Sequence, residues 1–132
     1  MKYLLDTNIW LELLLNQENA DTVSLFLDKT TSDLIAISDF SLHSIGIILS
    51  KLKMPEIFTE FIDDLFKTAA ISQLVLSPHE LTEIPEVINL YNLDFDDTYQ
   101  YLVAKNNQLE IVTFNNDYRR AGIITKKPSE LI

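Results

Sequence analysis

The sequence contains no cysteine, only two glycines and no long hydrophobic run. Without cysteine there can be no disulfide, no thiolate metal site and no cysteine nucleophile. No stretch approaches the roughly 18 apolar residues that a membrane-spanning helix needs, and the N-terminus lacks the basic and apolar regions of a signal peptide. Repeats, low-complexity runs and Gly/Ser linkers are absent as well. We therefore expect residues 1–132 to form a single domain of a soluble, cytoplasmic protein.

Basic residues are also scarce: 10 Lys and Arg stand against 20 Asp and Glu, which gives a formal net charge of −10. This balance argues against a surface that holds nucleic acid by neutralising its phosphates. Nucleic acid stays open as a substrate, because divalent cations bound by acidic side chains can hold phosphates. An acidic surface also favours a basic protein partner. The 47% hydrophobic content indicates a chain that can bury a substantial core.

The most informative segment is the N-terminal stretch from Tyr3 to Asn8. A short apolar run ends at Asp6, and an apolar pattern with helical spacing begins directly after it. In open α/β sheets, ligands and catalytic groups lie just beyond the carboxyl ends of the strands. Asp6 therefore stands where a catalytic or metal-binding carboxylate would lie. The same residue could serve only as the cap of the following helix, and this segment alone does not decide between the two roles.

Strand-like and helical patterns alternate along the whole chain. Strands are predicted at 2–5, 34–37, 73–76, 110–113 and near 123–124, with helices at 8–15, 20–29, 40–52, 56–69, 94–107 and, interrupted by prolines, 78–91. This alternation predicts a largely parallel sheet of four or five strands with helices on both faces. The helix at 40–52 is apolar over most of its circumference, which predicts burial, and Gly46 within it predicts close helix packing.

Three acids occur within four residues at Asp94, Asp96 and Asp97. A helix N-terminus offsets part of their mutual repulsion, and Asp94 and Asp97 have the spacing of a capping box. Capping explains one or two of the three acids and explains the third poorly. A divalent cation such as Mg²⁺ would stabilise the surplus charge better.

A third polar segment, from Asn115 to Asp117, follows the strand at 110–113. Turn formation by itself can account for these residue types. However, Asp6 and Asp117 both lie beyond strand ends, and Asp97 joins them if its helix begins at the same edge of the sheet. The three carboxylates together would then form an oxygen-only site for Mg²⁺ or Mn²⁺.

These segments resemble the main signatures of PIN domains, a family that includes the VapC-type ribonuclease toxins of prokaryotic toxin–antitoxin pairs. The segments are Leu5-Asp6-Thr7-Asn8, Asp94-Phe95-Asp96-Asp97-Thr98-Tyr99-Gln100-Tyr101 and Val112-Thr113-Phe114-Asn115-Asn116-Asp117-Tyr118. The resemblance implies a three-layer α/β/α sandwich around a central, mostly parallel sheet. It also implies Mg²⁺- or Mn²⁺-dependent cleavage of RNA by four clustered acids. Asp6 matches the first acid, Asp97 the third, and Asp117 an additional acid that often follows the fourth.

Two of the four family acids are replaced in this sequence. Ser44 stands at the position of the second acid, usually a glutamate, and Asn115 stands at the fourth. Asn115 can still offer a carbonyl oxygen to a metal but brings no charge, so we expect weaker metal binding. His43 is a candidate ligand or base, although an interior histidine is the more common case on such an apolar helix. His79 is expected to be an exposed turn residue.

Two functions are compatible with this pattern. The first is a metal-dependent ribonuclease with weakened activity, in which Asp6, Asp97 and Asp117 hold Mg²⁺ or Mn²⁺ while Asn115 and Ser44 assist through metal-bound water. The expected partners of such a ribonuclease are RNA, bound through the metal, and a basic antitoxin-like protein. A homodimer is also compatible with this function. The second is a catalytically degenerate PIN-fold protein that acts as a binding or regulatory module. The retained acids favour the first function, and the replaced acids and the net charge favour the second; we rank the nuclease first.

Overall fold

The computed structural model describes all residues from Met1 to Ile132. Its strands are β1 (Tyr3–Leu5), β2 (Ile35–Ser38), β3 (Ser72–Leu74), β4 (Glu110–Val112) and β5 (Thr125–Lys126). They form one sheet in the order β3-β2-β1-β4-β5, and every neighbouring pair is parallel. The predicted parallel sheet is therefore confirmed. Because β1 and β4 are paired in parallel, the residues that follow them emerge at the same edge.

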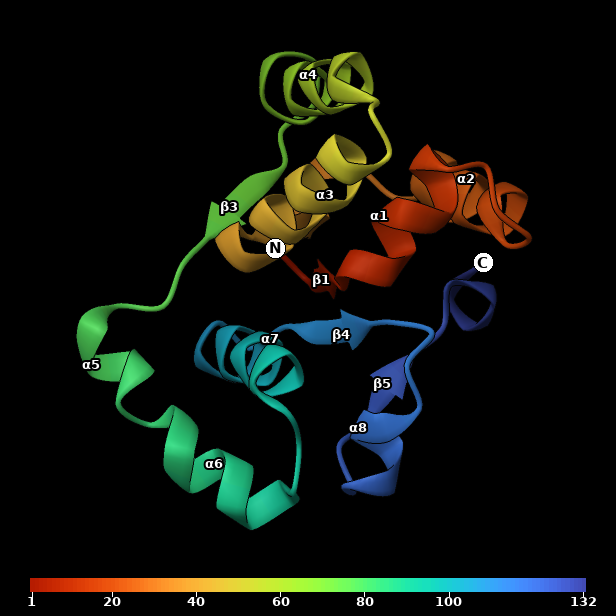
Figure 1. The fold of residues 1–132 in the computed structure, drawn as a ribbon. Helices are drawn as coiled ribbons and strands as arrows, with labels where there is room; N and C mark the ends of the chain where they lie inside the picture. The colour runs from red at the N-terminus through yellow and green to blue at the C-terminus, as the bar shows by residue number, and fades with distance from the viewer.

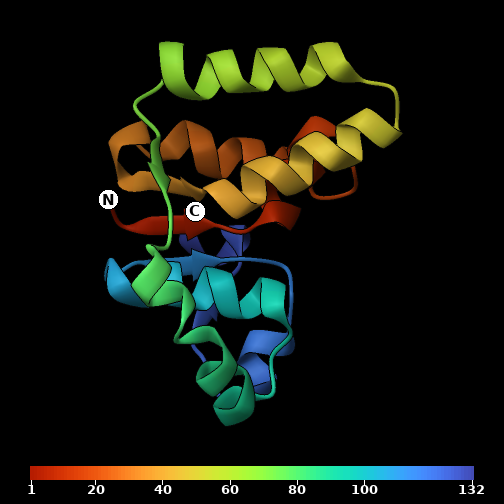
Figure 2. The ribbon, with the colours of Figure 1, turned by 60° about the vertical axis from the view of Figure 1, so that its left-hand side comes forward.

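Helices cover both faces of this sheet, as Figures 1 and 2 show. One layer contains α1 (Thr7–Leu14), α2 (Ala20–Lys29), α3 (Asp39–Lys51) and α4 (Pro55–Asp63), which continues into a π-helical turn at Asp64–Thr68. The chain then passes to the other side and forms α5 (Pro78–Leu81), α6 (Ile84–Tyr91), α7 (Phe95–Asn106) and α8 (Asp117–Arg120). Short 3-10 turns lie at Ser32–Leu34 and Pro128–Leu131. The predicted three-layer α/β/α sandwich is confirmed, and none of its helices is long and apolar enough to span a bilayer.

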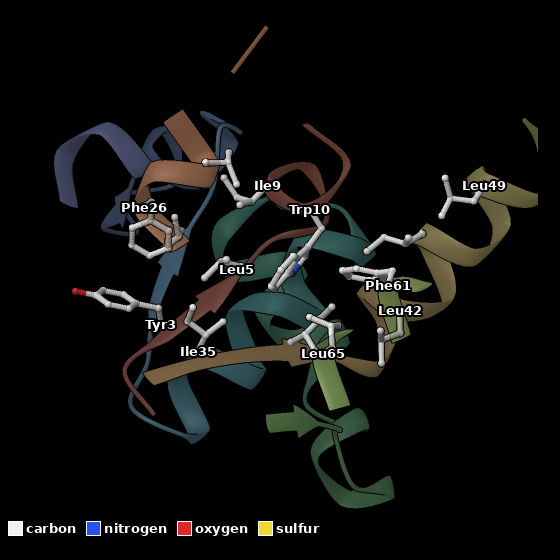
Figure 3. Close-up of a cluster of buried hydrophobic side chains, with 14 residues drawn as sticks. Tyr3, Leu5, Ile9, Trp10, Phe26, Ile35, Leu42, Leu49, Phe61 and Leu65 are labelled. Atoms are coloured by element: carbon white, nitrogen blue, oxygen red, sulfur yellow. The ribbon is translucent and has the colours of Figure 1, made fainter. Parts of the chain in front are cut away.

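The side chains of β1 alternate between two hydrophobic cores. Tyr3 and Leu5 belong to the core under α1 to α4, whereas Leu4 belongs to the core under α6 and α7. Figure 3 shows Trp10 in the first core beside Phe61, and their ring centroids lie 5.5 Å apart. All residues of β1 are buried, as expected for a parallel strand covered on both faces. Burial on both faces explains why a short apolar run sufficed to identify it.

Helix α3 differs from its prediction, because it lies in an outer layer and buries only one side. Leu42, Ile45 and Leu49 are buried, but Ile47 is 56% exposed, so the prediction of burial over most of its circumference was wrong. Gly46 faces α4, and a Cβ at this position would lie 3.2 Å from the Phe58 ring, which agrees with the predicted close helix packing.

The last strand begins later than the sequence predicts. Ile123 and Ile124 are apolar, but Ile124 is 83% exposed and the pairing with β4 begins at Thr125. The chain leaves α8 through Gly122, whose φ of 84° suits glycine. This turn directs Ile123 toward the second core and delays the strand.

Candidate active site at the strand ends

Asp6 follows β1 directly and is the N-cap of α1, so the two roles considered for it coincide in one side chain. Its Oδ1 accepts a hydrogen bond from the Thr7 amide at 2.9 Å. Its Oδ2 accepts a hydrogen bond from the Thr113 hydroxyl at 2.8 Å and a longer one from the Tyr118 phenol at 3.4 Å. The carboxylate, which is only 7% exposed, therefore links the ends of β1 and β4.

Gln100 in α7 makes the remaining contact with Asp6. Its Nε2 donates to Asp6 Oδ1 at 2.9 Å and to Ser41 Oγ at 2.8 Å, and its Oε1 accepts from Ser38 Oγ at 2.6 Å. The side chain is buried, so these bonds satisfy polar groups that water does not reach. The network ties the end of β2 and the start of α3 to the end of β1.

Asp97 enters the same region from the first turn of α7, whose N-cap is Asp94. Asp94 accepts a hydrogen bond from the Asp97 amide at 3.0 Å, so capping accounts for Asp94. The Asp97 carboxylate is buried and accepts from Asn115 Nδ2 at 3.1 and 3.2 Å. Burial and the charges of Asp94, Asp6 and Asp117 raise the pKa of Asp97 to about 6, although the Asn115 hydrogen bond opposes them. A cation would be stabilised beside such a carboxylate.

A cleft of about 310 Å³ opens over these carboxylates. Its walls contain four of the five predicted site residues, namely Asp6, Ser44, Asp97 and Asn115. Asp117 lies instead in a neighbouring cleft of about 450 Å³, which shares only Asp97 with the first. Residues that are far apart in the sequence are thus brought together around Asp97.

The Asp117 carboxylate is directed to Arg120, with which it forms an ion pair of 2.9 Å at the surface. The backbone amide of Asp117 donates to Asn115 Oδ1 at 2.9 Å. This bond orients the Asn115 side chain so that its amide nitrogen faces Asp97. It also occupies the Asn115 carbonyl oxygen, which was predicted from the sequence to be a metal ligand. Asn115 therefore acts on Asp97 as a hydrogen-bond donor.

With Asp117 outside the cleft, Asp6 and Asp97 are the carboxylates that could hold a divalent cation, and such a cation would have few protein ligands. No group of three or more His, Cys, Asp or Glu side chains is arranged to hold a metal ion. Mg²⁺ is commonly bound through one or two carboxylates, with water completing its coordination. Asp97 retains acceptor positions beyond its contact with Asn115, whereas hydrogen-bond donors already occupy both oxygens of Asp6. The donor set thus fits weak binding at Asp97, with the charge of Asp6 nearby.

Sequence reasoning assigned no role to Gln100, Thr113 and Tyr118, although all three lie inside the motifs. Thr113 carried a signal, because it is a polar residue at the end of an apolar run, whereas no local pattern marked Gln100 or Tyr118 as buried. Burial, with the charges of Asp6 and Asp97, raises the pKa of Tyr118, so its phenol stays protonated and can donate.

The two histidines do not contribute to the cleft. His43 is exposed on α3 and is absent from the cleft wall, so the expected interior histidine was wrong. The approximate apolar pattern of α3 concealed which of its sides faces solvent. His79 is exposed, as predicted, but it lies in α5 rather than in a turn.

Comparisons with known proteins agree with this architecture. A family model described as the PIN domain matches residues 3–124. A search of curated proteins found no match. One similar solved structure is VapC20 from Mycobacterium tuberculosis, described as a toxin that cleaves the sarcin–ricin loop, with a TM-score of 0.80 and 14% identity over 96% of this chain and 100% of that chain.

Two further structures share the fold. One is a toxin–antitoxin complex from Klebsiella pneumoniae, with a TM-score of 0.74 and 19% identity over 94% of this chain and 97% of that chain. The other is FitAcB from Neisseria gonorrhoeae, with a TM-score of 0.73 and 19% identity over 98% of this chain and 99% of that chain. The sheet order and the acids at its edge define a PIN-type α/β protein. The chain belongs to the PIN domain family, and the resemblance noted in its motifs is confirmed.

Proposed function

We propose that this protein is a Mg²⁺- or Mn²⁺-dependent ribonuclease with weakened activity, and that it is the toxin of a toxin–antitoxin pair. One observation carries the proposal. Asp6 and Asp97, which are 91 positions apart in the sequence, are both buried and line one cleft. Burying two carboxylates in one place is unfavourable for folding alone, and a bound cation would offset the repulsion.

Asp97 would be the main metal-binding residue, with Asp6 beside it and Asp117 contributing charge from the neighbouring cleft. A divalent cation bound there would supply an activated water and would stabilise negative charge on the leaving oxygen. Asn115 fixes the orientation of the Asp97 carboxylate through its amide. The Ser44 hydroxyl lines the cleft and can hydrogen-bond to water within it. Without glutamate and aspartate at these last two positions, the cleft carries less charge, which is why we propose weakened activity.

A basic antitoxin-like protein is the proposed partner. The net charge of −10 favours a partner of opposite sign. The similar structures include a toxin–antitoxin complex from Klebsiella pneumoniae and VapBC2 from Rickettsia felis bound to a DNA fragment from its promoter. A homodimer and a cytoplasmic location remain predictions from the sequence.

A second candidate is the binding or regulatory module that has lost catalysis. It is favoured by the hydrogen bonding of Asp6, because donors from Thr7, Gln100, Thr113 and Tyr118 occupy its oxygens. A carboxylate held in this way is stable without any metal. The two candidates therefore differ in whether a cation binds the cleft and whether RNA is then cleaved.

Titration of Mn²⁺ during RNA cleavage, with calorimetric titration of Mn²⁺ in parallel, separates the two candidates. The ribonuclease proposal expects weak Mn²⁺ binding and cleavage that depends on Mn²⁺, both abolished by Asp6→Asn. A matched control is Asp33→Asn, because Asp33 is exposed and its side chain makes no hydrogen bond or ion pair. Variants purified in the same way exclude a contaminating nuclease. Absence of cleavage at saturating Mn²⁺, or binding that survives Asp6→Asn, would favour the module.

A further inference from the structure

Gln100 is a buried polar side chain that hydrogen-bonds to Asp6, and its orientation is fixed by its partners. Ser38 Oγ accepts a hydrogen bond from the Ser41 amide at 3.0 Å, so its hydroxyl hydrogen is free to donate to Gln100 Oε1 at 2.6 Å. Both oxygens of Asp6 accept hydrogen bonds from donors around them. Both neighbours therefore require the same orientation, in which the amide nitrogen faces Asp6 and Ser41. Gln100 is 2% exposed, so no water competes for these positions.

We propose that Gln100 is a positioning residue that holds the Asp6 carboxylate in the place of a cation and thereby lowers the metal affinity of the cleft. This inference rests on the proposed function only in taking the cleft of Asp6 and Asp97 as the metal site. The Gln100 amide stabilises the charge of Asp6 with a neutral donor and keeps its oxygens directed at the strand ends. The site consequently keeps its shape without metal.

The same contact works against metal binding at Asp6. A cation that approaches Oδ1 must displace the Gln100 amide, which fills this position together with the Thr7 amide. The displaced Gln100 amide would then lose its charged acceptor at a buried position, which is unfavourable, whereas Ser41 Oγ would keep its 2.8 Å hydrogen bond with Thr7 Oγ1. Removing the Gln100 amide donor should therefore lower the stability of the metal-free protein and raise the affinity of the cleft for a cation.

Two substitutions test this coupling from different directions. Gln100→Met keeps an unbranched side chain of similar length and removes every donor. Gln100→Glu keeps an acceptor for Ser38 Oγ but turns a second carboxylate toward Asp6. The matched control is Tyr99→Phe on the same helix, since the buried Tyr99 hydroxyl bonds to Asp39 and to the Leu76 amide and does not contact Asp6.

The measurements are thermal unfolding in EDTA and in Mn²⁺, and calorimetric titration of Mn²⁺. We expect both Gln100 variants to melt lower than the parent in EDTA, to rise more on adding Mn²⁺, and to bind Mn²⁺ about tenfold more tightly, as loss of a competing bond to a charged group implies. Tyr99→Phe should have a lower melting temperature than the parent, and it should bind Mn²⁺ with the same affinity as the parent. A variant that folds only with Mn²⁺ also supports the inference. Parent-like affinity in both variants, an equal gain in Tyr99→Phe, or a variant that stays unfolded with and without Mn²⁺ overturns it.

RNA cleavage by the same proteins separates this inference from the proposed function. Tighter Mn²⁺ binding in the Gln100 variants with no cleavage by any protein would support the role of Gln100 and overturn the ribonuclease. Mn²⁺-dependent cleavage by the parent, with unchanged Mn²⁺ affinity in the Gln100 variants, would support the ribonuclease and overturn the role of Gln100.

Discussion

Replacing Asp97 by asparagine should stabilise the metal-free protein at pH 7. The pKa of Asp97 rises from 3.8 to about 6, chiefly through burial and then through Asp94 and Asp6. At about 1.4 kcal/mol per pKa unit this shift corresponds to about 3 kcal/mol. Screening by water in the open cleft reduces the expected effect to about 1–2 kcal/mol. The substituted amide keeps one oxygen to accept from Asn115, so the local hydrogen bond survives.

The pH dependence has a definite sign. Because the folded pKa of Asp97 lies above its unfolded value, the folded state binds this proton more tightly. The carboxyl group therefore favours folding most at low pH, and this contribution is lost as the pH rises from about 4 to about 6. Asp97→Asn should remove that decline and raise the melting temperature at pH 7 by about 4–8 °C.

Thermal unfolding in EDTA, followed by the fluorescence of Trp10, measures this difference. Trp10 is the single tryptophan and is 2% exposed, so its emission reports loss of the core. Melting curves at pH 4.5 and pH 7 should differ less for Asp97→Asn than for the parent, while Asp33→Asn behaves as the parent. A variant that melts at or below the parent at pH 7 would refute the claim that Asp97 is ionised there at the expense of stability.

Three further perturbations check other parts of the structure. Thr113→Val should lower stability by about 2–3 kcal/mol in chemical denaturation, since it leaves the buried carboxylate after β1 without its 2.8 Å donor; a loss under about 0.5 kcal/mol would mean the bond is not formed in solution. Gly46→Ala should change stability by less than about 1 kcal/mol, because the gain in helix propensity opposes the 3.2 Å approach to Phe58, whereas Gly46→Leu should clearly destabilise. The double variant Ser44→Glu with Asn115→Asp should melt lower in EDTA, show a larger Mn²⁺-induced rise in melting temperature and cleave more RNA than the parent; an equal rise in both proteins would place these positions away from the cation.

The positions of the strand ends could be predicted because they depend on residues that are adjacent in the sequence. Each buried parallel strand is a short apolar run, and the first polar residue after it must lie at the edge of the sheet. Asp6 follows this rule, and the register of β1 with β4 brings it to Thr113, which the sequence predicts as the last residue of a strand. The capping spacing of Asp94 likewise predicted a helix N-terminus that the structure contains.

The rest depends on contacts that no local pattern encodes. A glutamine in a helix usually lies at the surface, and Gln100 is buried only because Ser38, Ser41 and Asp6 arrive from other elements to bond with it. Asp117 matches a family position, yet Arg120 three residues later binds its carboxylate outside the cleft of Asp6.

The sheet order has a consequence for the synthesis of the chain. β1 lies at the centre, and one of its edges pairs with β2, which follows within about thirty residues. Its other edge pairs with β4, in which Glu110 is the partner of Tyr3. On the ribosome, that edge of β1 therefore has no neighbouring strand until β4 has been translated. The carboxylate of Asp6 is likewise made about 90 residues or more before Gln100, Thr113 and Tyr118, the three side chains that hydrogen-bond to it in the folded protein.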